Sequence, residues 1–341
     1  MIASAPGKLL LLGEYAVLDG APAAVVAVDR RARATLRPID GAHAWVHAPD
    51  LEASAQLDLA RCAWLDARAG RRLELVRRCV DVVAAEVGHA LAPFELTLDS
   101  AAFVGESGKL GLGSSAAVCV VSAAALLAHG GRADATREIV FEAALAAHRR
   151  WQSGRSSGTD IAASAFGGVL RYQIGEAPSI AALRWPAGVG AVCVYSGKPA
   201  STSKLVQRVD AFAAARPDAH RAIAARMREL AERGCEALAA GDSAAFIDAY
   251  GSYGAAMAEL GEAAEADIVS AAHRRIGELV REVGGAYKPC GAGGGDVGLA
   301  LCDAERVGAL QAKLRQANVE IVELALDAHG LIIEASEVSG E

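Results

Sequence analysis

The chain has 341 residues, of which 53% are hydrophobic and 22% are charged, and its formal net charge is −7. This composition is typical of a globular protein, and the length favours two domains over one. The acidic balance argues against a nucleic-acid-binding protein, which would carry a basic surface, so we expect no nucleic-acid partner.

The first half of the chain mixes predicted strands and helices. Residues 8–20 and 21–38 are predicted to form two strands around a glycine-containing turn. The alternating apolar pattern of residues 93–100 predicts another strand. Two helices are expected next, a buried Ala-rich one over about 115–129 and an amphipathic one over 134–150. Residues 153–160 are predicted to form a loop, and residues 161–173 to lead back toward a strand.

A polar segment punctuated by Pro and Gly, residues 174–190, predicts the domain boundary, which we place between 182 and 183. Beyond it, residues 205–284 are predicted to be mostly helical, with breaks at Pro217 and at Gly241. The other predicted elements of this half are strands at 191–197, 285–289, 297–302 and 319–326 and a helix over about 303–317.

Cysteine spacing and hydropathy bear on the compartment. The closest two of the seven cysteines, Cys290 and Cys302, are 12 positions apart, which excludes a Cys-x-x-Cys metal or redox pair. Several cysteines lie in apolar runs, as buried free thiols do in a reducing compartment. The longest nearly apolar run, residues 116–128, is shorter than the roughly 20 residues that cross a membrane. No signal-peptide pattern is found, and we expect a cytoplasmic protein without a membrane partner.

Three glycine-containing segments are candidate binding loops: residues 6–14, 111–115 and 291–296. Glycines before a helix leave backbone N–H groups free to face an anion, which the helix dipole also favours. Residues 111–115 have this form, because they open the Ala-rich helix. One such loop could equally be a tight turn without a ligand, but three in one chain favour binding.

Several familiar motifs fit only in part. "GLGSSA" (111–116) matches a dinucleotide-binding fingerprint, but it is not directly preceded by a strand in a βαβ unit. The phosphate-loop pattern ending in Gly-Lys-Ser/Thr fails, because Lys109 precedes the glycines. "GRSSG" (154–158) follows a helix, unlike a hydrolase nucleophile elbow, and "STSK" (201–204) lacks the companion motifs of a lactamase.

Taken in order, three segments resemble the signature motifs of the GHMP kinase superfamily: "APGKLLLLGEYAVLDG" (5–20), "GKLGLGSSAAV" (108–118) and "KPCGAGGGDVGLAL" (288–301). The resemblance implies an α+β fold with an N-terminal mixed α/β nucleotide-binding domain over 1–182 and a C-terminal ferredoxin-like domain over 183–341. It also implies ATP and Mg²⁺ as cofactors and a small-molecule phosphate acceptor as the partner.

Details of the motifs resemble the phosphomevalonate kinase branch, in which 5-phosphomevalonate becomes 5-diphosphomevalonate. "GEYAVLDG" has Tyr15 where mevalonate kinases tend to carry His, and residues 147–164 resemble the branch pattern. Mevalonate kinases place an acidic metal ligand about 11 residues before the loop aspartate, where this chain has Arg149. Ser153 and Cys290 depart from the usual Gly and Ser.

By the same resemblance, Lys8 and Asp160 are the expected catalytic residues, and Ser115 is the expected magnesium ligand. A carboxylate such as Asp160 can accept a proton or orient the attacking oxygen. The expected nucleotide contacts are Lys109, Gly111, Leu112, Gly113, Ser114, Ser115 and Ala116. The expected substrate contacts are Glu14, Tyr15, Ser157, Gly158, Lys198, Gly291, Ala292, Gly293 and Gly294.

A phosphorylated acceptor also needs cations, for which the candidates are Lys109, Lys198, Lys204, Arg149, Arg155 and Lys288. We expect His148 to pack or to hydrogen-bond rather than to bind a ligand. The alternatives are mevalonate kinase, another GHMP kinase, an ATP-dependent decarboxylase of the same pathway, or a nucleotide sensor without catalysis. A sensor need not keep Lys8, Ser115 and Asp160 together. The oligomeric state is left open between a monomer and a homodimer.

Overall fold

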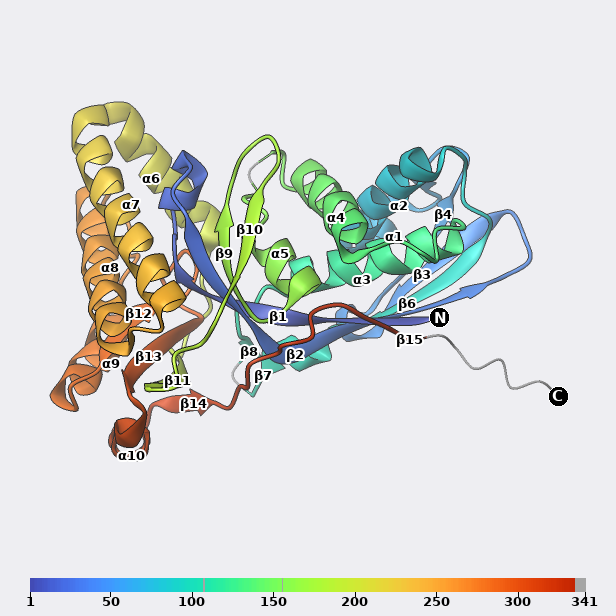
Figure 1. Ribbon diagram of the computed structural model, residues 1–341. Coiled ribbons are helices and arrows are strands. Elements are labelled where there is room, and N and C mark those ends of the chain that lie inside the picture. The colour runs from blue at the N-terminus through green and yellow to red at the C-terminus, as the bar shows by residue number, and fades with distance from the viewer. Residues whose placement is uncertain (107, 155, 335–341) are drawn as a thin grey trace.

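The computed structural model describes residues 1–106, 108–154 and 156–334, so Arg155, one of the expected cations, lies outside the described residues. Two lobes lie side by side in Figure 1, one built on a long twisted sheet and the other on a small sheet covered by long helices. This is the two-lobed α+β fold that the sequence predicts. None of the helices in the described part combines the length and apolarity that a membrane crossing requires.

The N-terminal lobe is organised around two long antiparallel strands, β1 (Ile2–Leu12) and β2 (Ala23–Pro38). In the described residues, its sheet has nine strands in the order β10-β9-β2-β6-β3-β4-β5, with β1 pairing β2 and β15. The other strands are β3 (His43–Ala48), β4 (Ala53–Asp58), β5 (Ala63–Trp64), β6 (Phe94–Asp99), β9 (Val169–Gln173), β10 (Ser179–Leu183) and β15 (Ile332–Glu334).

Four helices cover one face of this sheet: α2 (Glu74–Val87), α3 (Ser114–His129), α4 (Arg137–Trp151) and α5 (Thr159–Phe166) (Figure 1). Helix α3 is almost wholly buried, because its many alanines allow close packing against β1, β2 and the neighbouring helices. Shorter elements are α1 (Ala67–Gly70) and the small hairpin of β7 (Val104–Gly105) and β8 (Gly108–Lys109).

In this lobe the sequence misplaced the end of one strand and missed one helix. The strand predicted over residues 8–20 ends at Leu12, because the chain turns at Gly13, where φ is +106° and an added Cβ would lie 2.5 Å from Ala23 Cβ. Residues 161–173 lead to strand β9, as predicted, but residues 161–166 first belong to helix α5, which the sequence did not predict. The run is apolar and short, so its periodicity cannot separate a buried helix from a strand.

The C-terminal lobe contains a four-stranded antiparallel sheet in the order β12-β13-β11-β14. Its strands are β11 (Val189–Tyr195), β12 (Ala286–Pro289), β13 (Val297–Asp303) and β14 (Glu320–Val322). Its helices are α6 (Thr202–Ala215), α7 (Pro217–Ala240), α8 (Ser243–Ala263), α9 (Ala271–Glu282) and α10 (Val307–Gln316). The order of elements along the chain, together with this strand order, is ferredoxin-like, as expected.

Both predicted helix breaks in this lobe are confirmed. Pro217 is the first residue of α7, where its missing N–H costs no helical hydrogen bond. Gly241 ends α7 in the left-handed conformation with φ of +71°. A further break, over residues 264–270 between α8 and α9, was not predicted.

The end of the described chain leaves the C-terminal lobe and runs back along the N-terminal one (Figure 1). Strand β15 pairs with β1, and Leu326 forms an isolated bridge with Val28. We call residues 325–331 the C-terminal strap. The predicted boundary between residues 182 and 183 falls at the end of β10, but the strap and β15, assigned to the second domain, pack on the first.

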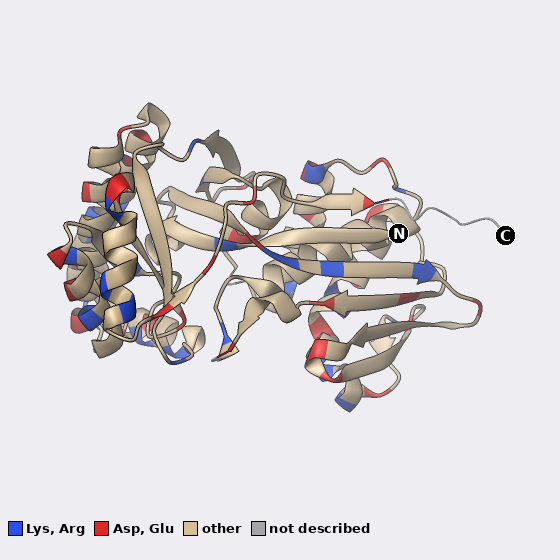
Figure 2. Ribbon diagram, turned by 90° about the horizontal axis from the view of Figure 1, so that it is seen from below, with Lys and Arg blue, Asp and Glu red and all other residues tan. Residues whose placement is uncertain are grey.

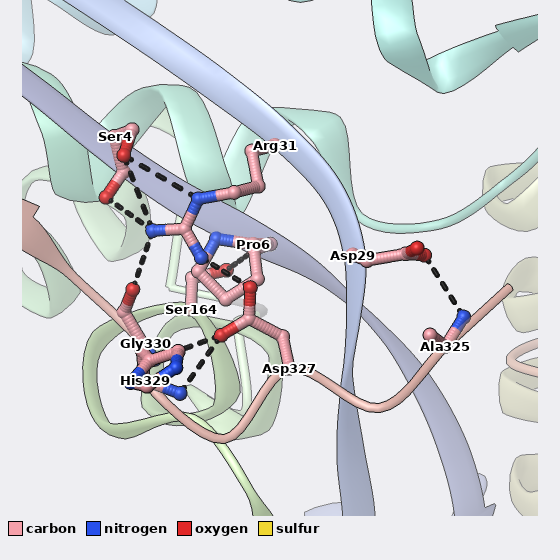
Figure 3. A network of polar contacts seen from close by, with 9 residues as sticks. All are labelled: Ser4, Pro6, Asp29, Arg31, Ser164, Ala325, Asp327, His329 and Gly330. Carbon is pink, nitrogen blue, oxygen red and sulfur yellow. Dashed lines mark hydrogen bonds and ion pairs between the residues drawn. The ribbon is translucent and has the colours of Figure 1, made fainter.

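An ion pair between Arg31 and Asp327 holds the strap (Figure 3). Arg31 also donates from Nη2 to Ser4 O at 2.9 Å and to Gly330 O at 2.6 Å. The other carboxylate oxygen of Asp327 accepts from the amides of His329 and Gly330. Every strong hydrogen-bonding group of this partly buried pair therefore has a partner on the strap or on β1.

Basic and acidic residues are mixed over the outer helices of the C-terminal lobe (Figure 2). Basic side chains also follow β2, and several are engaged within the protein. Arg31 pairs with Asp327, Arg37 pairs with Glu95, and Arg30 donates to Glu323 O at 3.1 Å.

We predict that Arg31→Met lowers the free energy of unfolding by about 2–4 kcal/mol, because it leaves the Asp327 carboxylate buried without its cation. Chemical denaturation measures this. Arg33→Met is the matched control, since Arg33 lies two residues along the same strand and is exposed. Equal losses in the two variants would contradict the stabilising role of the pair.

Candidate active site

Residues 111–115, where α3 begins, have the geometry of an anion site, and we call them the phosphate loop. Gly111 and Gly113 have φ of +76° and +79°, and Gly113 is the N-cap residue directly before α3, with no side chain capping the first amides. A Cβ on Gly113 would lie 3.0 Å from Lys8 Cε, so a larger residue would be both strained and crowded. The amides at this helix end, which include those of Ser114 and Ser115, are free to face a phosphate.

The two expected catalytic residues lie together beside this loop. Lys8 is on β1, and its backbone N–H donates to Leu112 O at 2.8 Å. Its Nζ lies 3.2 Å from Oδ1 of Asp160, which is in the first turn of α5. The Lys8 side chain is 8% exposed and that of Asp160 is 37% exposed. The carboxylate is thus open to an incoming molecule, while the ammonium lies beneath it.

Lys8 stays charged despite its burial. Burial alone disfavours the ammonium, but the charge and hydrogen bond of Asp160 outweigh it, helped by the charge of Glu14, and the pKa of Lys8 is raised above its usual value. A permanently protonated lysine suits charge stabilisation and excludes Lys8 as a base near neutral pH.

Ser115, the expected magnesium ligand, lies close to a buried histidine. His148, on α4, has Nε2 3.4 Å from Ser115 Oγ and Nδ1 2.8 Å from Ser156 Oγ. Burial lowers the pKa of His148, and the charge of Asp160 only partly opposes this. The expectation that His148 makes hydrogen bonds is met, but its partners, which belong to the phosphate loop and to the segment before α5, could not be read from the sequence.

The third glycine-rich segment, residues 290–296, lies between strands β12 and β13. Gly293 has φ of +80°, and an added Cβ would lie 2.2 Å from Ile268 O. The hydroxyl of Tyr15, from the first segment, donates to Ala292 O at 2.6 Å. Tyr15 itself has a positive φ of 62°, which is unusual for a non-glycine residue and indicates a fixed turn. This contact joins the first and third segments across the two lobes.

Glu14 and Lys288 form an ion pair in the interior, where their side chains are 1% and 0% exposed. Lys288 Nζ also donates to Leu10 O at 3.3 Å and lies over the ring of Tyr250. Burial raises the pKa of Glu14 in spite of the nearby Lys288 charge. The contact of Glu14 with a substrate stays a prediction, and its carboxylate faces Lys288 inside the protein.

Asp296 belongs to the third motif, but the sequence did not predict that it lies at the site. A Cβ on Gly111 would lie 2.5 Å from Asp296 Oδ2, so this carboxylate packs against the phosphate loop. Its other oxygen accepts from Ala200 N at 3.0 Å. Burial raises the pKa of Asp296, while Lys109 and Lys8 lower it. The loops 108–113, 196–200 and 290–296 therefore meet here.

The remaining expected contacts are more scattered. Lys198 is 48% exposed and pairs with Asp267 at 3.3 Å on the surface. Ser157 and Gly158 lie directly before α5, and Tyr172 OH donates to Ser157 O at 2.5 Å. The substrate and nucleotide roles of all these residues stay predictions.

A groove of about 770 Å³ lies apart from this cluster, between α4, the end of α5 and the β9–β10 hairpin. Its lining is mostly apolar and includes Arg149, one of the expected cations, but not Lys8, Ser115 or Asp160. The converging loops, and not this groove, form the candidate active site, because phosphate recognition needs amides and cations rather than an apolar groove.

The donor set fits a magnesium ion that arrives with a nucleotide. Mg²⁺ is usually bound through one or two carboxylates and substrate phosphates, and it keeps several waters. The Ser115 hydroxyl and the Asp160 carboxylate, each in the first turn of a helix, can supply protein oxygens. Within the described ranges, no three His, Cys, Asp or Glu side chains cluster into a metal site of their own.

Comparisons with known proteins show the family of this chain. Residues 74–168 match the family described as GHMP kinases N terminal domain. The chain is 31% identical to a phosphomevalonate kinase of Streptomyces sp. (strain CL190), over 89% of this chain and 90% of that protein. It is 32% identical to a mevalonate kinase of Thermococcus sibiricus, over 61% of each. The chain belongs to the GHMP kinase family.

Solved structures show the same fold. A Lin0012 protein from Listeria innocua superposes with a TM-score of 0.85 at 23% identity, covering 95% of this chain and 98% of that one. Streptococcus pneumoniae phosphomevalonate kinase in complex with phosphomevalonate and AMPPNP superposes with a TM-score of 0.81 at 21% identity, covering 96% and 99%.

A buried histidine, His273, supports the third glycine-rich segment, and the sequence did not predict this role. His273, on α9, has Nε2 3.1 Å from Gly295 O and Nδ1 2.8 Å from Tyr287 OH. Nε2 donates to the carbonyl, and in the neutral ring Nδ1 accepts from the phenol. Burial, the main cause, lowers the pKa of His273 to about 4.

We predict that stability falls as the pH drops from about 6.5 to about 4, because in this range the unfolded chain binds a proton at His273 and the folded protein does not. Above this range both states are neutral and the contribution is constant. The slope contributed by His273 approaches about 1.4 kcal/mol per pH unit. Urea denaturation of the wild type and His273→Gln at several pH values measures it, and parallel pH curves would refute the assignment.

Proposed function

We propose that this protein transfers the γ-phosphoryl group of ATP to 5-phosphomevalonate, forming ADP and 5-diphosphomevalonate. The observation that carries the proposal is the Lys8–Asp160 pair beside the glycine-rich start of α3, with the ammonium buried and the carboxylate open. The choice of acceptor is supported by the relative from Streptomyces, which is similar over nearly the whole chain.

In this reaction the protein mainly positions the reactants and stabilises charge. The amides of residues 111–115 hold the β- and γ-phosphates of ATP at the positive end of the α3 dipole. The Ser115 hydroxyl and the Asp160 carboxylate are the protein oxygens that can bind Mg²⁺. When bound, this ion neutralises charge that develops on the transferred group.

The acceptor oxygen belongs to a phosphate that is largely ionised near neutral pH, so it needs no strong base. This oxygen attacks the γ-phosphorus, and the bond from that phosphorus to the β–γ bridging oxygen breaks to release ADP. Asp160 orients the attacking phosphate or its cation, and Lys8 stabilises the negative charge of the transferred group. Because the pKa of Lys8 is raised, its ammonium persists throughout the working pH range.

We also propose that the only partner needed for catalysis is this small molecule, that the protein works in the cytoplasm, and that it is a monomer or a homodimer. All seven cysteines are free in the structure, which supports a reducing setting. Light scattering after size-exclusion chromatography measures the oligomeric state.

We predict that ADP is released with Mg-ATP and 5-phosphomevalonate, but not with mevalonate, homoserine, galactose or no acceptor. Asp160→Asn should lower kcat by about 100-fold or more, because it removes a charge that faces the reacting groups. A coupled assay for ADP measures both. Asp40→Asn, an exposed residue in a turn of the same lobe, is the matched control and should keep full activity.

Turnover with mevalonate instead would reject the proposed acceptor and retain a small-molecule kinase. Release of carbon dioxide would indicate a decarboxylase. Nucleotide binding without turnover on any acceptor would favour a sensor.

A further inference from the structure

We propose that Ser164 is a positioning residue that fixes α5 against β1 and so holds Asp160 at Lys8. This inference rests on the proposed function, because it assigns the alignment of that same pair to a third residue. Ser164 is fully buried, and its hydroxyl donates to Pro6 O at 2.8 Å (Figure 3).

The hydrogen bond from Ser164 to Pro6 is a second contact between α5 and β1, beside the ion pair of Asp160 with Lys8. Ser164 lies four residues after Asp160 in α5, and residues four apart share one face of a helix. Pro6 lies two residues before Lys8 in β1. One end of α5 thus meets β1 through the Lys8–Asp160 pair and its next turn through Ser164 and Pro6.

The backbone acceptor lies at a break in the strand ladder. The register between β1 and β2 shifts between Pro6 and Gly7. At such a shift the regular pattern of strand hydrogen bonds is interrupted, and a carbonyl can be left for another donor. A carbonyl fixed by two flanking stretches of sheet is also a more rigid reference point than a side chain.

Helix α5 needs this support because it is short. It has eight residues, which is too few for a helix to be stable by itself in water. At its far end the strap contributes a bond from Leu331 N to Ala165 O at 3.0 Å, and a Cβ on Gly167 would meet Gly330 N at 2.3 Å. These backbone contacts fix where the helix ends, whereas the Ser164 hydroxyl joins it to the strand that carries Lys8.

We expect Ser164→Ala to lower kcat by about 10- to 100-fold, because a displacement of about 1 Å in a reacting group can have an effect of that size. The KM values for ATP and for the acceptor should change by less than about threefold, since the Ser164 hydroxyl bonds to Pro6 O and not to the phosphate loop. Ser164→Cys has a similar size and a weaker donor, so its kcat should fall between those of the wild type and Ser164→Ala.

Ser122→Ala is the matched control. Ser122 lies in α3, is fully buried and has no hydrogen-bond partner for its hydroxyl among the described residues. The same atom is therefore removed from the same kind of environment, without a link to β1. Its kcat should equal that of the wild type. If Ser122→Ala and Ser164→Ala have the same kcat, or if Ser164→Cys does not exceed Ser164→Ala, the positioning role is rejected.

A second readout separates this inference from the choice of reaction. The rate at which an amine-reactive reagent modifies Lys8, followed by peptide mass spectrometry, reports how firmly Asp160 covers the ammonium. We expect faster modification of Lys8 in Ser164→Ala than in Ser122→Ala, even if the wild type uses another acceptor or none. An unchanged rate would overturn the inference, whereas missing turnover in the wild type would overturn only the proposed function.

Discussion

The site depends on the ion pair between Glu14 and Lys288, which joins the two lobes in the interior. Breaking such a pair by removing one partner leaves an uncompensated buried charge and costs several kcal/mol, so the segments that carry the two residues are held in one arrangement. Glu14 follows β1 and lies next to Tyr15, whose hydroxyl bonds to Ala292 O. Lys288 lies on β12, just before the third glycine-rich segment. The lobe that supplies Lys8 and the lobe that supplies residues 290–296 are thereby fixed relative to each other.

The site is shaped by segments that approach the backbone of the phosphate loop closely, at its glycines. Gly113 leaves room for the Lys8 side chain, and Gly111 leaves room for Asp296. Both glycines have positive φ. Each therefore allows the chain to turn and also leaves space for a charged side chain from another segment. A lysine and a carboxylate are thereby brought against one loop. This arrangement suits a ligand with several negative charges and an accompanying cation.

The sequence predicted the fold and named Lys8 and Asp160 as catalytic residues, because three ordered motifs resemble one family. It did not predict that these two side chains form an ion pair. It predicted the breaks at Pro217 and Gly241, since these residues act through local backbone chemistry. It did not predict helix α5, whose short apolar run lacks a decisive period, or the strap. The contacts of His148, Ser164 and Lys288 also escaped it. Each bridges positions that are distant in the chain and become neighbours only once the whole fold is in place, so no local pattern marks them.

The strap also constrains the order in which the chain can mature during synthesis. Strand β1 is made early, but its partner β15 and the strap residue Asp327 are among the last parts of the described chain to leave the ribosome. Until then one edge of β1 stays unpaired at residues 2–4, and Arg31 lacks its carboxylate. An open strand edge invites pairing with other chains. Pairing with β15 is therefore the step that closes this edge, and chains that still lack the strap are the form most exposed to aggregation and to chaperones.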